Sequence, residues 1–333
     1  DAVTAAARGV AALIARFHGE GSVEGVIGLG GSAGTTIATA GMRVLPIGVP
    51  KVMASTLASG NVRHYVGDKD ILMLNTIVDV SGINRVSRIV LGEAARAMAG
   101  LVKFRNKQEA SADKPVIAAT MFGVTTPCVE RARRVLEEAG YEVLVFHATG
   151  TGGQAMESLI VDGLIAGVLD ITTTELADEL VGGVLSAGPD RLTAAGRKGI
   201  PQVISVGALD MVNFGPPETV PPKFADRKFY HHNPTVTLMR TTVEENRNLG
   251  EEIARKAATA TGPTAILFPL QGVSAIDREG QPFDDLAARR TLLDALRRNH
   301  GTVELIELDY HINDPQFAEA GARKLIDIMK SSR

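Results

Sequence analysis

A glycine-rich turn between residues 25 and 60 constrains the fold of this chain more than any other stretch. An apolar pair, Val26-Ile27, runs directly into the turn, and a helix-like stretch and a second apolar run at 52–54 follow it. The residues of the turn that could contact a ligand are Gly28, Gly30, Gly31, Ser32, Gly34, Thr35 and Thr36. The order strand, turn, helix, strand is typical of a parallel sheet with helical crossovers.

The composition of this turn suits the binding of an anion such as phosphate. Backbone N–H groups at the start of a helix have no partner inside the helix, and the helix dipole is positive there. Glycine is needed where the backbone takes a positive φ or where a phosphate approaches it closely. The string matches neither GxGxxG nor GxxxxGK[ST], so a bare strand-to-helix turn is the alternative.

A second glycine-rich loop follows an expected strand at 141–146. Its residues that could contact a ligand are Thr149, Gly150, Thr151, Gly152 and Gly153. His147 lies between the strand and this loop, at the kind of strand end where open α/β sheets bind ligands. It could act as a general acid or base, or it could be structural. The sequence does not decide which loop holds the ligand, or whether both line one cleft between two domains.

The length of the chain predicts two domains. A chain of 333 residues exceeds the size of one ordinary hydrophobic core. The stretch 105–114 is charged and poor in apolar residues, and it separates two periodic regions. We therefore expect an N-terminal α/β subdomain at 1–112 and a C-terminal α/β subdomain at 113–333.

Composition argues against several classes of partner. A net charge of −3 and an aromatic content of 4% give no basis for direct binding of nucleic acid. No apolar run approaches the ~18 residues that a membrane helix requires. The chain has one cysteine, Cys128, which fits a reducing compartment, so we expect a cytoplasmic protein. We expect Cys128 to be a buried, inert thiol.

A repeated pattern predicts that the two halves of the chain are duplicates. The matching segments are 25–28 and 48–52 in the first copy, and 167–170 and 199–203 in the second. A helix precedes each copy, at 2–18 and at 154–162. Only the second copy has a strand, helix and strand in front of that helix, at 115–146. We therefore expect the natural protein to carry roughly 60–80 further residues upstream, which would complete the first sheet.

Long strings of the sequence carry a family likeness. They are GLGGSAGTTIATAGMRVLPIGVPKVMASTLASG, TMFGVTTPCVERAR, VFHATGTGGQAMESLI, GVLDITTTELADELVGGVLSAGPDRL, SVGALDMVNFGPPETVP, HNPTVTLMRTT and ELDYHINDPQFA. Through these strings the chain resembles the Tm-1-like family, also called the UPF0261 family, over essentially its whole length. Members of that family are expected to carry a further N-terminal segment with a GTxDTKG-like motif, which residues 1–333 do not contain.

The resemblance implies two Rossmann-like doubly wound subdomains with parallel sheets and a ligand cleft between them. It implies ATP as the cofactor, with Mg²⁺ as a companion of its phosphates, and a homodimer as the assembly. The apolar helix around 91–102 could supply the dimer contact. We expect no structural metal site, because the chain has no HxxxH or CxxC pattern.

Two further groups of polar residues have both functional and structural interpretations. Asp210 and Asn213, in the irregular stretch 207–235, could hold Mg²⁺ or a ribose, or they could only cap turns. Near the end of the chain, His311 could be catalytic, and Asp314 is expected to cap the last helix.

Two patterns predict local structure. The cluster that contains His311 and Asp314 opens with Asp309, directly after the expected last strand. Earlier in the chain, residues 172–174 are three threonines, which we expect to cap a helix at 175–185.

Three functions fit these observations. The first is a nucleotide-binding protein of the Tm-1-like family whose natural reaction is unknown. The second is a metabolic enzyme that acts on a small phosphorylated or carboxylated metabolite. The third is a non-enzymatic interaction module, which the resemblance to the plant member suggests. Neither the residues nor the fold class identifies a substrate.

Overall fold

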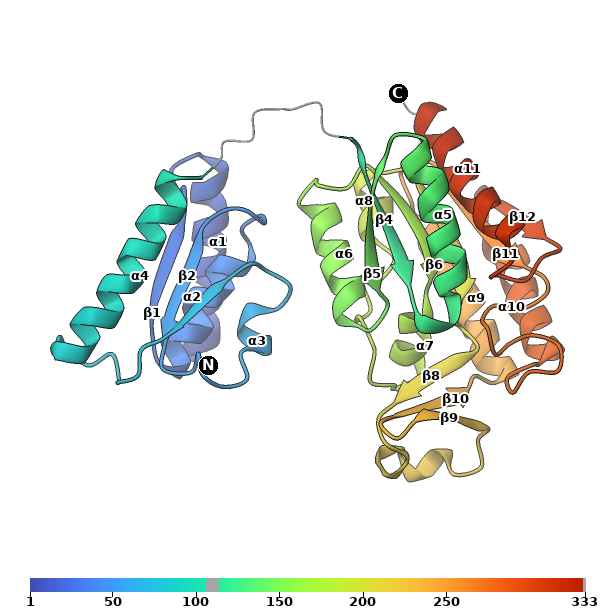
Figure 1. The fold of residues 1–333 in the computed structure, drawn as a ribbon, viewed down its shortest axis with the longest axis horizontal. Helices are drawn as coiled ribbons and strands as arrows, with labels where there is room; N and C mark the ends of the chain where they lie inside the picture. Colours follow the sequence, from blue (N-terminus) through green and yellow to red (C-terminus); the bar gives the residue numbers. More distant parts are fainter. Residues whose placement is uncertain (106–113, 332–333) are drawn as a thin grey trace. The chain divides into compact units, whose positions relative to one another are not determined.

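The computed structural model describes residues 1–105 and 114–331, and the chain forms two compact units (Figure 1). Unit 1 is Asp1–Ala112 and unit 2 is Asp113–Arg333. Most of the boundary stretch expected at 105–114 lies outside the described residues. Each unit contains a parallel sheet with helices packed on it, which confirms the expected α/β class.

Unit 1 contains a three-stranded parallel sheet in the order β1-β2-β3. Its elements are α1 (Ala2–Gly19), β1 (Val26–Gly30), α2 (Ser32–Arg43), β2 (Lys51–Ser55), α3 (Arg63–Val66), β3 (Leu72–Asn75) and α4 (Arg85–Lys103). Because side chains alternate along a strand, Met53 packs with Met42 of α2 on one face, and Val52 packs with Ala94 of α4 on the other. Both faces of β2 are covered, as expected for a strand inside a parallel sheet.

Unit 2 contains a six-stranded parallel sheet in the order β12-β11-β7-β6-β4-β5. Its strands are β4 (Val116–Met121), β5 (Glu142–His147), β6 (Gly167–Thr172), β7 (Gln202–Gly207), β11 (Thr264–Pro269) and β12 (Glu304–Leu308). Its α-helices are α5 (Thr126–Glu138), α6 (Thr151–Val161), α7 (Thr174–Val181), α8 (Ala194–Lys198), α9 (Val243–Ala258), α10 (Leu286–Asn299) and α11 (Pro315–Ser331).

Two helical layers enclose this larger sheet. The helices α5 and α11 pack on one face, whereas α6, α8, α9 and α10 pack on the other. The direction in which successive strands are added reverses between β4 and β6. This point is the topological switch point, beside which open α/β sheets usually bind ligands.

A small antiparallel sheet, in the order β8-β10-β9, is attached to unit 2. It consists of β8 (Met211–Phe214), β9 (Phe229–Asn233) and β10 (Val236–Arg240). The expectation that 207–235 is irregular was therefore wrong. Its two strands are only 4 and 5 residues long and a proline-rich segment separates them, so neither gives a readable alternation.

The register of the two parallel sheets supports the duplication. Val26 of β1 pairs with Lys51 of β2, and Val168 of β6 pairs with Gln202 of β7. These four positions correspond in the repeated pattern, so the Gly-x-Pro segments before β2 and β7 set the same register. By this correspondence, β1, β2 and β3 take the places of β6, β7 and β11.

The two copies differ at one sheet edge. On the side away from β7, β6 pairs with β4. Among the described strands, β1 pairs with β2 alone. Its side chains Ile27 and Leu29 are 43% and 49% exposed, which is unusual for apolar residues of a parallel strand.

Candidate functional site

The glycine-rich turn of unit 1 lies at the carboxyl edge of its sheet. Gly30 is the last residue of β1, Gly31 is the N-cap of α2, and Ser32 is exposed at the first helical position. Glycine has no side chain that could cap the helix. None of the described side chains accepts a hydrogen bond from the first-turn N–H groups of α2, so these donors are open to a ligand.

Most glycines of this turn are needed for close packing. A methyl group on Gly28 would lie 2.5 Å from the Cβ of Ala38, and one on Gly30 would lie 2.9 Å from the Cα of Gly34. A methyl group on Gly34 would in turn lie 3.2 Å from the carbonyl oxygen of Leu29. These three glycines let α2 lie directly against β1.

Gly31 is the exception, because a methyl group there would make only an ordinary van der Waals contact. The nearest atom to a methyl group on Gly31 would be the hydroxyl oxygen of Thr56, at 3.5 Å. Gly31 has a φ of −85°, and no glycine of this turn has a positive φ. Positive φ therefore does not account for the glycines of this turn.

The hydroxyl side chains of the turn divide into buried and accessible groups. Thr35 is buried, and its Oγ1 lies 2.7 Å from the Oγ of Ser55, so it joins α2 to β2. Thr36 donates to the carbonyl oxygen of Ser32 at 2.9 Å. The sequence interpretation missed Thr56, which follows β2 and whose N–H donates to the carbonyl oxygen of Gly30 at 3.3 Å.

The second glycine-rich loop is filled by a side chain of the protein itself. This loop joins β5 to α6, and its Gly150 has a φ of 83°. The N–H groups of Gly150 and Gly153 donate to Oε1 of the fully buried Glu175, at 2.7 and 3.1 Å. A carboxylate of unit 2 thus takes the position at which an anionic ligand would meet the start of α6.

Packing explains the other glycines of this loop. A methyl group on Gly152 would overlap the carbonyl oxygen of His147, and one on Gly153 would overlap the carboxylate of Glu175. The flanking Thr149 is partly buried, and Thr151 is exposed. Close packing alone therefore explains why this loop contains glycines, without a bound ligand.

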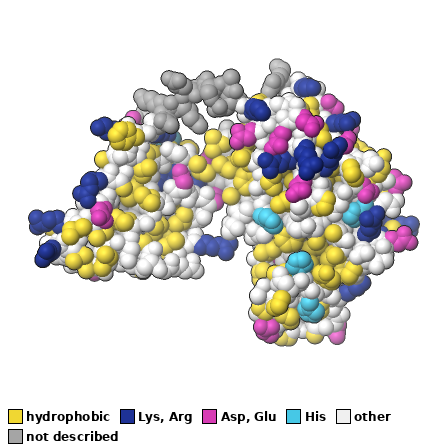
Figure 2. Space-filling model, in the orientation of Figure 1, with side chains coloured by type: hydrophobic (Ala, Val, Ile, Leu, Met, Phe, Trp, Pro, Cys, Tyr) yellow, Lys and Arg dark blue, Asp and Glu magenta, His cyan; other side chains and the backbone are white. Residues whose placement is uncertain are grey.

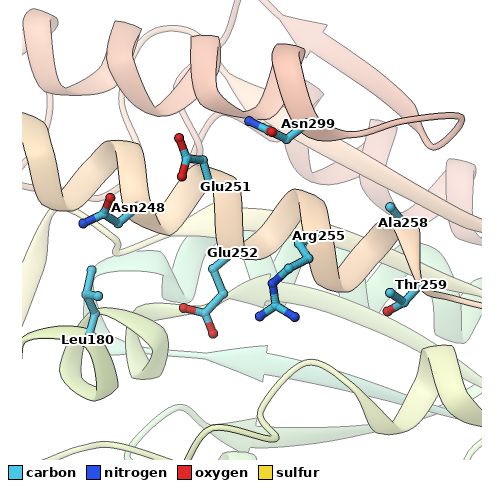
Figure 3. Close-up of a pocket in the computed structure, with 8 residues that line it drawn as sticks. All are labelled: Leu180, Asn248, Glu251, Glu252, Arg255, Ala258, Thr259 and Asn299. Carbon is cyan, nitrogen blue, oxygen red and sulfur yellow. The ribbon is translucent and has the colours of Figure 1, made fainter.

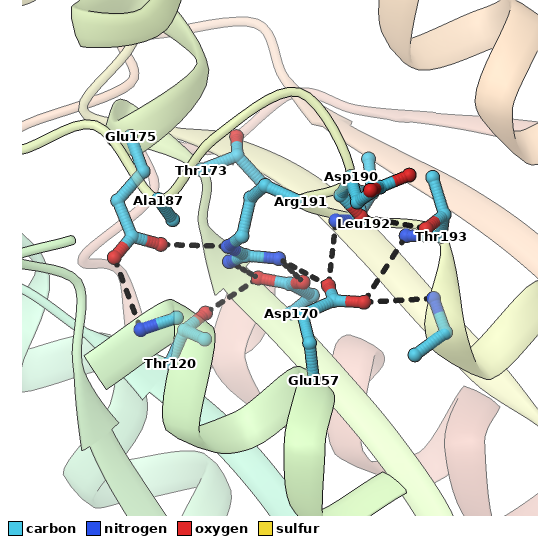
Figure 4. Close-up of polar contacts among 12 residues, drawn as sticks. Thr120, Glu157, Asp170, Thr173, Glu175, Ala187, Asp190, Arg191, Leu192 and Thr193 are labelled. Atoms are coloured by element: carbon cyan, nitrogen blue, oxygen red, sulfur yellow. Dashed lines mark hydrogen bonds and ion pairs between the residues drawn. The ribbon is translucent and has the colours of Figure 1, made fainter. Parts of the chain in front are cut away.

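Arg191 holds the carboxylate of Glu175 from the other side (Figure 4). Its Nε donates to Oε2 of Glu175 at 2.6 Å. Its Nη1 and Nη2 donate to the two carboxylate oxygens of Asp170 at 2.6 and 2.7 Å, a bidentate geometry. Thr120 donates to the same Asp170 at 2.7 Å. These four side chains are buried, so they form a desolvated network.

Glu157 extends the network to the start of α8. Its carboxylate accepts from the N–H groups of Leu192 at 2.6 Å and Ala194 at 2.7 Å, and it lies 3.4 Å from Nη1 of Arg191. Burial disfavours the charge of Arg191, but the surrounding carboxylates hold its pKa above the ordinary value. Burial also raises the pKa of Glu175, against the lowering effect of Arg191.

The network joins the two strands that flank the switch point of unit 2. Thr120 lies on β4 and Asp170 lies on β6, the two strands that flank this point. The predicted threonine cap does not form: Thr172 donates to the carbonyl oxygen of Thr120 and Thr173 to that of Ser205, at 3.1 and 3.0 Å. These hydroxyl groups tie neighbouring strands together.

Asp210 and Asn213 are buried and do not share a site. Asp210 accepts from the hydroxyl of Ser274 at 2.8 Å, and Asn213 donates to Asp178 at 2.7 Å. Both side chains therefore have structural partners within the protein. Among residues 1–105 and 114–331 there is no group of three or more His, Cys, Asp or Glu residues that could hold a metal ion.

The residues after β12 also have partners within the protein. Nε2 of His311 lies 2.8 Å from the carbonyl oxygen of Ser274, and burial lowers the pKa of His311. Asp309 accepts from the side chain of Gln271 at 2.5 Å. The carboxylate of Asp314 accepts from the N–H of His311 at 2.8 Å, before the last helix begins.

Cys128 and His147 have opposite exposures. Cys128 is fully buried, as expected, and burial raises the pKa of its thiol. His147 is exposed at the end of β5, with its ring 6.1 Å from that of Phe122.

Among the helices at 1–105 and 114–331, none combines the length and the apolar composition that a membrane span needs.

A wide hollow of about 720 Å³ lies beside α9 (Figure 3). Its lining comes mainly from exposed polar residues of α9, such as Asn248, Glu251 and Arg255. Glu252 in this lining forms an ion pair with Lys256 at 2.7 Å. A shallow surface of this kind shows no convergence of unpaired polar groups, so we assign it no function.

We predict that Asp178→Asn makes the stability of the protein less dependent on pH. Burial raises the pKa of Asp178 to about 7, so between its ordinary value of about 3.9 and pH 7 the native state holds a proton that the unfolded state lacks. The free energy of unfolding therefore falls as pH rises through this window, by up to about 1.4 kcal/mol per pH unit. Urea denaturation at pH 5, 6 and 7 measures the slope.

The control for this prediction is Asp226→Asn, because Asp226 is exposed. It should leave the slope of stability against pH unchanged. An equal slope in Asp178→Asn and the unmodified protein would show that Asp178 is ionised throughout this range.

The fold and the turn together define a class: a two-unit α/β protein with flavodoxin-like strand order in unit 2 and an open helix N-terminus in unit 1. Residues 1–107 match the N-terminal domain of the Uncharacterised protein family UPF0261, and residues 114–329 match its C-terminal domain. The chain therefore belongs to the UPF0261 family.

Individual relatives agree with this assignment. The chain is 54% identical to a UPF0261 protein of Clostridium tetani over 97% of its own length and 80% of that protein. It is 53% identical to a UPF0261 protein of Rhizobium meliloti over 92% of its length and 77% of that protein. It is 48% identical to the ToMV resistance protein Tm-1(GCR237) of Solanum lycopersicum over 94% of its length, which is 43% of the tomato protein.

Proposed function

We propose that unit 1 binds a nucleotide, with ATP as the first candidate, through phosphate contacts at the start of α2. One observation carries the proposal: the N–H groups at this helix start have no capping side chain, whereas two N–H groups at the start of α6 donate to Glu175. This contrast favours the first of the two glycine-rich loops. The ligand is expected at Gly30, Gly31 and Ser32, with the hydroxyls of Thr36 and Thr56 nearby.

The location of this turn suits a phosphate group. It lies at the carboxyl end of β1, the strand that corresponds to β6 at the switch point of unit 2. The space beside Gly31 leaves the backbone accessible, and the helix dipole favours a negative charge there. A bound Mg²⁺ would be held mainly by the phosphates and water, since Mg²⁺ keeps several waters when it binds with nucleotides.

Calorimetric titration of the full chain tests this function. We expect ATP to bind, with and without Mg²⁺, and inorganic phosphate to compete weakly for the same site. Citrate serves as the carboxylate probe. Binding of citrate without any binding of ATP would favour the alternative of a metabolic enzyme for carboxylated substrates, and would contradict the proposal.

Turnover separates binding from catalysis. The release of phosphate from ATP by the purified chain would identify an enzyme. If ATP binds but no phosphate is released, the chain is a nucleotide-binding protein without ATPase activity. In that case the bound nucleotide stabilises unit 1 by mass action.

A further inference from the structure

The helix α4 of unit 1 carries large apolar side chains on a side that the core does not use. Its inner face packs on β2 through Ala94 and Met98. Outside this contact lie four apolar side chains that are well exposed, of which Ile89 and Phe104 are 56% and 75% exposed. We call the four the apolar stripe; they are Val86, Ile89, Leu101 and Phe104.

The position of the apolar stripe is fixed by the fold. At about 3.6 residues per turn, its four members fall within about one third of the helix circumference. The helix start is held by a capping box: Oδ1 of Asn84 accepts from the N–H of Ser87 at 2.9 Å, and Oγ of Ser87 accepts from the N–H of Asn84 at 2.8 Å. Because the cap and the inner face hold α4 in place, the stripe is a surface feature of folded unit 1.

Basic side chains lie beside the apolar stripe on the same helix. The whole chain has a net charge of −3, but Glu93 is the one acidic residue within α4. Nζ of Lys103 lies 5.4 Å from the centre of the Phe104 ring. Figure 2 shows Lys and Arg side chains next to hydrophobic ones along the edge of unit 1 that α4 forms in Figure 1. Four basic residues of α4 are exposed, and none forms an ion pair with a described residue: Arg85, Arg88, Arg96 and Lys103.

We propose that this face of α4 binds the surface of an anionic lipid bilayer. Helices with adjacent apolar and basic faces lie in the plane of the bilayer interface, with the apolar side chains at the acyl boundary. Lys and Arg side chains extend to the anionic headgroups, which attract them. The charge and the exposed apolar area of α4 match both properties of such a surface. The interaction lies on the membrane and needs no spanning helix.

Two features favour a bilayer over a protein partner. A two-fold contact between copies through this face would bring the unpaired arginines of both copies together, and their like charges repel. A partner that encloses a basic helix in a groove needs access to much of its circumference, but Val90 and Ala94 on the inner side of α4 are buried. A flat anionic surface needs only the exposed side. Because α4 and α2 pack on opposite faces of the sheet, this surface is separate from the proposed nucleotide site.

Co-sedimentation of the full chain with lipid vesicles tests the proposal. We expect binding to vesicles that contain phosphatidylcholine and phosphatidylserine in equal amounts, and little binding to vesicles of phosphatidylcholine alone. Binding should fall as the salt concentration rises from about 0.1 M to about 1 M, because the Debye length shortens from about 10 Å to about 3 Å.

A double variant, Arg85→Gln with Arg96→Gln, tests the charge of α4. Each basic residue close to an anionic surface strengthens binding about fivefold, so the double variant should bind the mixed vesicles about 25-fold more weakly. Glu93→Gln removes the acidic residue of α4 and should strengthen binding. The matched control is Arg8→Gln with Arg63→Gln, since both residues are exposed in unit 1 outside α4 and the loss of charge is the same. The control should bind like the unmodified chain.

A single variant, Ile89→Ser, tests the apolar stripe. Moving a large apolar side chain from water into the bilayer contributes about tenfold or more in affinity, so its loss should weaken binding by this factor. The matched control is Leu13→Ser on α1, because Leu13 is also an exposed apolar residue of a unit 1 helix. Thermal denaturation should show that both variants stay folded, since neither side chain is buried.

The outcomes are distinct. Binding to the mixed vesicles that is weakened in Arg85→Gln with Arg96→Gln and in Ile89→Ser supports the proposal. Absence of binding by the unmodified chain overturns it, and so does equal binding by the unmodified chain and the double variant. If light scattering shows that Ile89→Ser converts a dimer into a monomer and no vesicles are bound, the face belongs to a second copy and the proposal is overturned.

Discussion

Replacing Arg191 with methionine is expected to destabilise unit 2 by about 3–5 kcal/mol. The guanidinium is fully buried and hydrogen bonds to Asp170 and Glu175, and it lies within 3.4 Å of Glu157. Removing it leaves these carboxylates without their cation in a desolvated interior. The loss is large because the network, and not only one contact, loses its charge balance.

Urea denaturation followed by far-UV circular dichroism measures this loss. The control is Arg197→Met, since Arg197 pairs with Asp190 at the surface, where both side chains are more than two thirds exposed. That change should cost less than about 0.5 kcal/mol. If Arg191→Met were as stable as Arg197→Met, the buried network would not hold the switch point of unit 2 together.

Replacing Gly31 with valine is expected to remove nucleotide binding while the protein stays folded. A valine side chain would cover the N–H groups at the start of α2 that we propose contact the phosphates. Each hydrogen bond to a charged group contributes about 1.5–3 kcal/mol, so loss of two of them weakens binding about 100-fold or more. We expect the fold to tolerate the change because Gly31 has a negative φ and a Cβ there would approach no atom closer than 3.5 Å.

The matched control is Gly9→Val, in the exposed part of α1. Like Gly31, Gly9 has no atom close enough to clash with a new side chain and lies in unit 1. Calorimetry should give unchanged ATP affinity for Gly9→Val. Unchanged affinity in a folded Gly31→Val protein would exclude the α2 site.

Local patterns in the sequence predicted most of the parallel elements. The helix expected at 2–18 is α1, and the strand expected at 141–146 is β5. Such elements are readable because apolar spacing and turn residues act within a few positions of the chain. The antiparallel strands β8 and β9 were missed because their partner, β10, defines them more than their own residues do.

The roles of the candidate sites could not be predicted from local patterns. Glycine-rich turns were located in the sequence, but their roles depend on atoms far away along the chain. Gly150 and Gly153 donate to Glu175, 25 and 22 residues away, and that carboxylate is in turn held by Arg191. In the sequence, Glu175 looks like an acidic residue in the first turn of a helix, and Arg191 looks like an ordinary loop residue. Neither pattern indicates that the two side chains are buried and paired.

The central claim is that a nucleotide meets the start of α2 and not the start of α6. Hydrogen–deuterium exchange of the full chain, with and without saturating ATP and Mg²⁺, tests it most directly. We predict slower exchange of the amides at 31–35 on binding and no change at 150–154, where Glu175 already accepts hydrogen bonds from two of the N–H groups. Protection at 150–154 without protection at 31–35 would contradict the account.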